Sequence, residues 1–410
     1  MKIWMRLLAG SIIGVLLGAY LPESGGDTAE LFSEISAYVV RIARYFLFPL
    51  VFFGLITGTT ELMRERRLPA VYGKTLGLLL AATAVAILVG TGAVLAVAPG
   101  RIPPIFQEAP RGQVPVVSEL LERVFPHNLF ALFGGGGDFL LPFMVPALFI
   151  GLALYADQSA GSAVSQFADS ASRVFYRLSA FVVEILGIGM IAVAAAVVFD
   201  IRGINDFQIF SSLILTVSLA VGFIVLVVYP LLIYFLIDRD SALPWLYAMI
   251  APLITGLFSG DVYFSLPTLE RIGKENLGVP RRVGSAVFSL AAVFGKAGSA
   301  LVATASFIVI LRSYTALEIT VVQVMWVAVS TFGVSFLLGA VPGSAVLVAL
   351  AMLANLYGRG MEEVYVILWP AAPILIRLGA VLDVATAGFV AQVVGVTEKM
   401  RRRVDPYDFI

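Results

Sequence analysis

Two apolar stretches that are interrupted at their middles decide the fold: LFSGDVYFSLP at Leu257–Pro267 and LGAVPGSA at Leu338–Ala345. Each is followed by an apolar segment that contains ionisable residues, Lys296 after the first stretch and Arg377 with Asp383 after the second. In a bilayer, non-helical backbone is tolerated only where it packs in protein or lines a cavity. We therefore interpret both stretches as re-entrant hairpins with tips at mid-depth. Interrupted segments at matching positions of two halves indicate the binding site of a secondary transporter.

The composition indicates a membrane protein. Of the 410 residues, 60% are hydrophobic and 13% are charged, whereas soluble domains carry about 25% charged residues. The formal net charge is zero, so no basic surface of the size that nucleic acid requires is expected. The chain has no cysteine, which excludes disulfides, thiolate catalysis and iron–sulfur clusters. A single histidine, His127, cannot form a histidine metal site by itself, and no cofactor or metal site is predicted.

Apolar runs long enough to cross a bilayer occur about eight times along the chain, at roughly 20 residues each. They lie near Trp4–Leu21, Val39–Thr60, Leu76–Ala98, Leu140–Ala156, Phe175–Val198, Ile209–Ile237, Gly284–Leu311 and Val364–Val394. The two interrupted stretches precede the last two runs. The sequence therefore predicts an all-α polytopic membrane protein with eight transmembrane helices and two re-entrant helical hairpins.

Basic residues in short loops predict the orientation, because such residues concentrate on the cytoplasmic side. They form three clusters, at 64–74, at 271–282 and at 399–403. An even number of spans with both termini cytoplasmic places all three clusters inside and makes Pro99–Pro115 an external loop. We expect a multi-pass protein of the inner membrane, surrounded by lipid. Arg41 and Arg44, near the start of the second run, are interpreted as side chains that extend to the interface.

Five motifs in order resemble the dicarboxylate/amino acid:cation symporter family, which includes the glutamate transporters. They are FLFPLVFFGLITG at Phe46–Gly58, FPHNLF with LLPFMVPALFIGLAL within Phe125–Leu154, SLP at Ser265–Pro267, ENLGVPRR at Glu275–Arg282, and GAVPGSA at Gly339–Ala345. Each motif alone is weak, but together they cover almost the whole chain and end near Val390–Glu398.

The resemblance implies a homotrimer that works by elevator-like alternating access. It implies a scaffold at residues 1–75 and 125–235, and a third span with an external loop at 76–124. It also implies a transport core at 236–400, with hairpin 1 at 244–276, helix 7 at 281–312, hairpin 2 at 321–357 and helix 8 at 362–399.

The chain departs from the family at the site that this resemblance implies. The family's serine-rich first tip reads SGDVYFS at Ser259–Ser265, and its sodium-holding Asn-Met-Asp-Gly-Thr motif reads GKAGS at Gly295–Ser299. In the eighth helix the family has an aspartate, an arginine, an asparagine and a second aspartate, whereas this chain has Arg377 and Asp383 with Thr386. Arg377 does not match the substrate-binding arginine in the same register. The coupling ion therefore stays open between sodium, a proton and none.

Four charged side chains would lie at membrane depth: Asp261, Lys296, Arg377 and Asp383. Each costs roughly 2.5–3.5 kcal/mol at the centre of a spanning helix, or on the order of 10 kcal/mol together if unpaired. We therefore expect them to meet one another or a water-filled cavity.

We hypothesise that Lys296 is a fixed cation that replaces a mobile one and compensates Asp383. The alternative is that its side chain only extends to the interface or packs in a static ion pair. Asp261 is predicted to accept a substrate ammonium or a proton, or alternatively only to cap the hairpin tip. Arg377 is expected to bind a substrate carboxylate. Further candidate substrate contacts are Tyr263, Ser265, Ser299, Ser344 and Thr386.

The function predicted from these features is secondary active transport of a small organic anion, such as a dicarboxylate or an amino acid. Two alternatives come from other classes: a passive ion or anion channel, and a non-transporting sensor or chaperone subunit that kept the fold. An enzyme is not expected, because no nucleophile–base pair or metal cluster is found among the candidates.

Overall fold

The computed structural model describes residues 2–22, 27–103, 124–125, 128, 139–157, 161–204, 207–314, 319–341, 343–358 and 360–410. His127 and most of the predicted external loop Pro99–Pro115 lie outside these ranges. Within them the regular secondary structure is helical throughout, which confirms the predicted all-α class.

The N-terminal half contains α1 (Ile3–Tyr20), α2 (Asp27–Arg44), α3 (Leu47–Arg64), α4 (Leu68–Val97), α7 (Leu141–Ala156), α8 (Ser162–Arg202), α9 (Phe207–Phe223), the π-helical turn η1 (Ile224–Val228) and α10 (Tyr229–Leu236). The C-terminal half contains α11 (Ala242–Ser259), α12 (Val262–Glu275), α13 (Arg281–Phe294), α14 (Ala297–Tyr314), α15 (Val321–Ser335), α16 (Ala345–Tyr357) and α17 (Ala372–Thr397). Short 3₁₀ turns are η2 (Arg239–Ser241), η3 (Leu338–Ala340), η4 (Val364–Leu368) and η5 (Pro406–Asp408).

Among the described residues, 8 helical segments are long and apolar enough to cross a membrane, in agreement with a multi-pass protein. This set of eight segments differs from the predicted set in one segment. Leu141–Ala156 has only 16 residues, whereas Arg239–Ser259, the first limb of the first hairpin, reaches 21 residues and qualifies by length. Length and hydropathy alone therefore do not separate a spanning helix from a hairpin limb.

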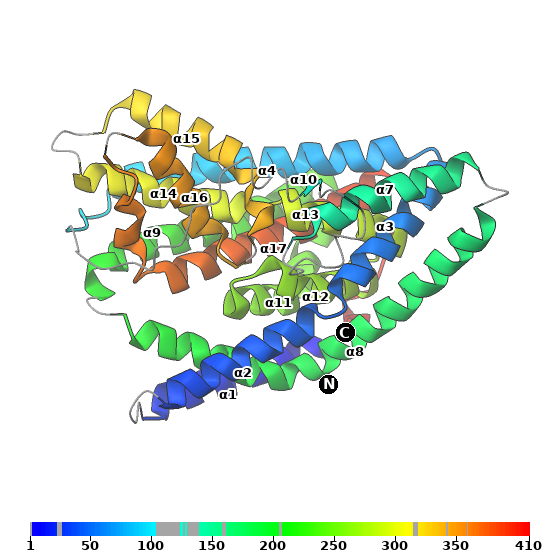
Figure 1. Ribbon diagram of the computed structural model, residues 1–410, viewed down its shortest axis with the longest axis horizontal. Coiled ribbons are helices and arrows are strands. Elements are labelled where there is room, and N and C mark those ends of the chain that lie inside the picture. Colours follow the sequence, from blue (N-terminus) through cyan, green and yellow to red (C-terminus); the bar gives the residue numbers. More distant parts are fainter. Residues whose placement is uncertain are drawn as a thin grey trace.

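The helices form layers around a buried centre (Figure 1). Helices α1, α2 and α8 lie together on one side and α4 on the other, with α13, α14 and α17 between them. Almost every residue of α13 and α14 is buried. Helix α1 approaches α8 closely because Gly10 and Gly14 lack a Cβ, which would collide with the α8 backbone at Gly187 and Ile191. Small residues allow such close packing between membrane helices.

The first hairpin turns more sharply than the sequence suggested. Helix α11 ends at Ser259, Gly260 adopts φ +67° in the left-handed region, and α12 begins at Val262. Glycine adopts this conformation without a steric penalty. The predicted interruption through Pro267 is wrong, because Pro267 lies inside α12.

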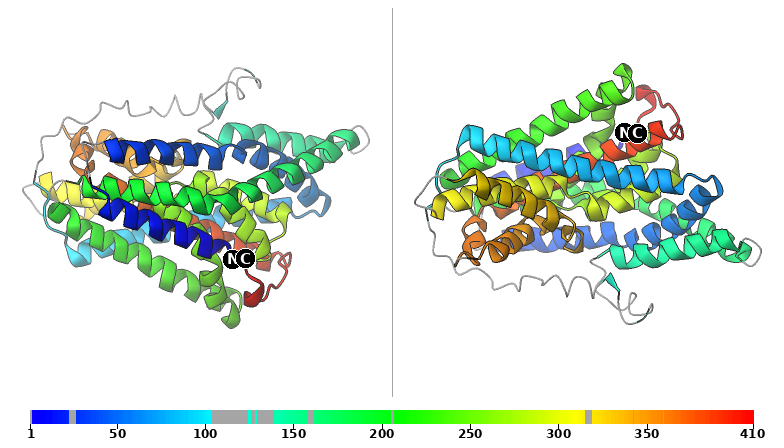
Figure 2. Two further views of the ribbon diagram at one scale, coloured as in Figure 1. Left: turned by 90° about the horizontal axis from the view of Figure 1, so that it is seen from below. Right: turned by 90° about the horizontal axis from the view of Figure 1, so that it is seen from above.

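The second hairpin turns over a longer segment. Helix α15 ends at Ser335, η3 follows at Leu338–Ala340, and α16 begins at Ala345. Pro342 lies outside the described residues. The two chain ends lie side by side (Figure 2), where Lys2 Nζ donates hydrogen bonds to the Tyr247 hydroxyl (3.3 Å) and to the Tyr407 carbonyl (3.5 Å).

Candidate solute-binding site between the hairpin tips

A small cavity, with room for about one water molecule, lies where the two hairpin tips meet the interruption between α13 and α14. Gly260 and Gly343 line it from the two tips, and Lys296 and Ser299 line it from the interruption. Helix α17 contributes Asp383 to the same cavity. The cavity thus joins residues from four separate parts of the C-terminal half, as hairpins that turn inside a membrane are expected to do.

Lys296 is the least satisfied charged group of the cavity. Its side chain is only 2% exposed. Its Nζ lies 5.7 Å from the centroid of the Tyr263 ring, which is within the range of a cation–π contact. Across the described residues, no hydrogen bond or ion pair of Nζ is found within the usual distances. The ammonium therefore has an aromatic face beside it but no direct anionic partner.

Asp383 is held by the start of α14 rather than by Lys296. It is 1% exposed, and its Oδ1 accepts the N–H groups of Gly298 (2.6 Å) and Ser299 (3.3 Å). Its Oδ2 accepts the Ser299 hydroxyl (2.7 Å). A carboxylate at a helix N-terminus is stabilised by these free N–H groups and by the helix dipole. The direct Lys296–Asp383 pair considered from the sequence is not formed.

Gly298 allows this arrangement because it has no side chain. A Cβ at Gly298 would collide with the carbonyl oxygen of Gly379 on α17. The missing side chain lets the first turn of α14 approach α17 closely enough for Asp383 to accept its N–H groups.

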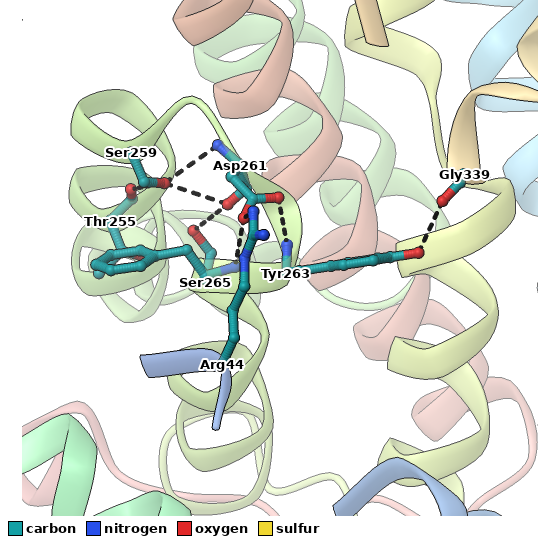
Figure 3. Close-up of polar contacts among 8 residues, drawn as sticks. Arg44, Thr255, Ser259, Asp261, Tyr263, Ser265 and Gly339 are labelled. Carbon is teal, nitrogen blue, oxygen red and sulfur yellow. Dashed lines mark hydrogen bonds and ion pairs between the residues drawn. The ribbon is translucent and has the colours of Figure 1, made fainter. Parts of the chain in front are cut away.

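Both carboxylate oxygens of Asp261, at the tip of hairpin 1, have partners (Figure 3). It is 3% exposed, and its two oxygens accept the N–H groups of Tyr263 (3.0 Å) and Phe264 (3.1 Å), so it caps α12. Its Oδ2 also forms an ion pair with Arg44 at the end of α2. Arg44 therefore does not extend to the interface as interpreted from the sequence. Without Arg44, which is partly buried, the Asp261 carboxylate would be a buried charge without a counter-ion.

Tyr263 connects the two hairpins. Its hydroxyl donates to the Gly339 carbonyl in the turn η3 (2.8 Å), as Figure 3 shows, and accepts the Leu140 N–H (3.5 Å). Ser265 donates to the Asp261 carbonyl (3.2 Å). Both side chains are buried. Their hydroxyl groups are used in hydrogen bonds that hold the hairpin tip in place.

Three other candidate residues lie outside the set that lines the cavity. The Arg377 guanidinium donates to Asp200 on α8 (2.9 Å) rather than to the site. Thr386 shares a 2.6 Å hydrogen bond with the Tyr229 hydroxyl on α10. Ser344 precedes α16 and makes no capping hydrogen bond with its side chain. The predicted role of Arg377 as a carboxylate handle is therefore not supported, because the register of α17 turns it toward the N-terminal half.

Sequence reasoning missed Arg44, Asp200 and Tyr229 as partners of the candidate residues. For Arg44 a signal existed, since a buried carboxylate at Asp261 requires a cation and Arg44 lies in an apolar run. Asp200 and Tyr229 carried no comparable signal.

The chain matches the model of the sodium:dicarboxylate symporter family over residues 3–396, and it belongs to this family. It is similar to the C4-dicarboxylate transport protein of Cupriavidus pinatubonensis, with 24% identity over 197 residues that cover 46% of this chain and 44% of that protein. It is also similar to neutral amino acid transporter B(0) of Bos taurus, with 25% identity over 336 residues that cover 71% of this chain and 61% of that protein. The matched region thus spans less than half the length of the C4-dicarboxylate relative.

Membership of this family confirms the resemblance inferred from the five motifs. The family and the relatives named above are transporters, which confirms the prediction that the chain is not an enzyme.

Proposed function

We propose that this chain is a secondary active transporter that binds a carboxylate of a small organic anion at Lys296. The observation that supports this proposal is the buried Lys296 ammonium, which lines the cavity between the hairpin tips without a direct anionic partner among the described residues. A charge at membrane depth is unfavourable by roughly 2.5–3.5 kcal/mol, and a carboxylate that reaches the cavity compensates this charge at the cost of losing its own water. The relatives named for C4-dicarboxylates and for neutral amino acids suggest these two substrate classes.

The transporter does not depend on sodium in this proposal. Asp383 already accepts three hydrogen bonds from Gly298 and Ser299, and Lys296 lies in the cavity beside it. The fixed ammonium takes the electrostatic role of a mobile cation. The C-terminal half moves as an elevator relative to the N-terminal half. The assembly is a homotrimer in the inner membrane, with both chain termini cytoplasmic.

Uptake into proteoliposomes tests the proposal. Radiolabelled succinate, aspartate and alanine are offered to the purified protein in sodium, potassium and choline buffers. Saturable uptake with counter-exchange, at equal rates in the three buffers, is expected. A strict sodium requirement overturns the fixed-cation role of Lys296, and current without saturable exchange indicates the channel alternative.

A further inference from the structure

A second small cavity, with room for about one water molecule, lies at the base of the first hairpin, away from the tips. It is lined by Glu270 and Lys274 of α12, by Arg281 and Ser285 of α13, and by Tyr176 of α8. It therefore lies at the seam between the C-terminal half, which holds the hairpins, and the N-terminal half. Nothing in the proposed solute site uses these residues.

Glu270 is the buried acid of this cavity. Its side chain is 7% exposed, and in the described part of the chain its Oε1 has no hydrogen-bond partner. The Tyr176 hydroxyl, which lines the same cavity, is also buried and without a hydrogen-bond partner there. Two unsatisfied polar atoms around one space are unusual, because buried polar groups in native proteins are almost always hydrogen-bonded.

The basic side chains around Glu270 form ion pairs with other carboxylates. Arg281 donates to Asp169 on α8 (2.6 Å), and Asp169 also pairs with Arg173. Lys274 pairs with Glu275 (3.3 Å) and lies 4.8 Å from the centroid of the Tyr176 ring. Among the described residues, neither Arg281 nor Lys274 forms an ion pair with Glu270. An ionised carboxylate without a partner is strongly disfavoured in such a place, and the neutral acid avoids that penalty.

We propose that Glu270 is the binding site of a coupling proton, in the cavity that the Tyr176 hydroxyl also lines across the seam between the two halves. The inference rests on the proposed transport function, because it names the ion that moves with the solute. The proton is taken from water on one side by the Glu270 carboxylate and is returned to water on the other side. Movement of α12 relative to α8 opens the cavity and permits the release.

The distance along the hairpin fits this role. Glu270 lies nine residues after Asp261 on α12, which is roughly 14 Å at 1.5 Å per residue. The proton site and the solute cavity are thus separate, but α12 connects them, so a shift of the hairpin acts on both.

Infrared spectroscopy of the full-length protein in lipid tests proton binding without any solute. The difference spectrum between wild type and Glu270→Gln at pH 7 should contain the C=O stretching band of one protonated carboxylic acid. Tyr176→Phe should retain this band, because the Tyr176 hydroxyl makes no hydrogen bond to Glu270 among the described residues. Glu275→Gln, the matched control on the same helix, should show no such band, since Glu275 is exposed. Absence of the band for Glu270 overturns the proposal.

Proteoliposomes that contain a trapped pH indicator test the coupling. Succinate or alanine uptake by wild type should acidify the lumen and slow at least tenfold when the external pH rises from 5.5 to 8.5. Glu270→Gln should retain counter-exchange but lose the acidification and the pH dependence, whereas Glu275→Gln should behave as wild type. Unchanged acidification in Glu270→Gln overturns the coupling role. If no probe solute is taken up by wild type, the transport function fails, and the infrared band alone decides whether Glu270 holds a proton.

Discussion

Helix α12 carries a buried acid near each end, and the two acids differ in almost every contact. Asp261, at the hairpin tip, accepts two backbone N–H groups and pairs with Arg44. Glu270, near the base, has no hydrogen bond or ion pair among the described residues. Both are more than nine-tenths buried. Burial alone therefore does not indicate the role of an acid, since the first is held by the folded framework and the second has no hydrogen-bond or ion-pair partner among the described residues.

The same contrast holds for the basic residues of the two cavities. Lys296 at the tips lacks a direct anionic partner among the described residues, while Arg281 at the base is paired with Asp169. Each cavity thus contains one ionisable group without a direct partner: an ammonium in the cavity at the tips and a carboxyl in the cavity at the base. This difference suggests a carboxylate ligand for the first cavity and a proton for the second.

The largest effect is expected from Lys296→Met, which removes the charge and keeps an unbranched side chain. Uptake of succinate or alanine should fall at least 100-fold, because the loss of a desolvated ion pair is worth about 3 kcal/mol or more. The measurement is initial uptake in proteoliposomes. Lys399→Met, at an exposed position after α17, should retain uptake within twofold. Normal uptake by Lys296→Met would falsify the carboxylate-binding role.

Arg44→Gln should destabilise the fold by about 3 kcal/mol, because it leaves the buried Asp261 carboxylate without its counter-ion. The thermal midpoint in detergent measures the change. Adding Asp261→Asn to Arg44→Gln should recover most of the loss, since the amide needs no counter-ion. Arg41→Gln on the exposed face of the same helix is the control. Equal midpoints for Arg44→Gln and Arg41→Gln would contradict a structural ion pair at the tip.

Tyr263→Phe should lower stability by about 1 kcal/mol, because the hydrogen bond to the Gly339 carbonyl is lost and that acceptor is left buried. Opening of the two hairpins should become easier. Ala345→Cys, which lines the cavity, can be labelled selectively because the natural chain has no cysteine. Its labelling rate by a thiol reagent should rise in the Tyr263→Phe background. An unchanged rate would show that this bond does not hold the tips together.

Arg377→Gln should have the smallest effect. Asp200 is half exposed in its pair with Arg377, and such pairs contribute about 0–1 kcal/mol. Apparent affinity for succinate should change less than twofold in an uptake assay. A loss of affinity comparable to that of Lys296→Met would show that Arg377 also binds the substrate.

The sequence by itself determined the helical membrane fold, the two interrupted hairpins and the family. These features are local, because hydropathy over about 20 residues predicts a span and glycine predicts where a helix ends. It also identified Lys296, Ser299 and Asp383, which line one cavity. Their shared location follows from the interruption at Gly295–Lys296 and the neighbouring α17.

Only the tertiary structure decided which charged side chains form ion pairs with one another. Arg44 and Asp261 are 217 positions apart in sequence, and Arg377 and Asp200 are 177 positions apart. The register of α17 turns Asp383 into the cavity and Arg377 away from it, although only six positions separate them. The sequence shows that a charge lies in an apolar segment and therefore needs a partner. It does not show which helix provides that partner, because this depends on how helices distant in sequence pack together.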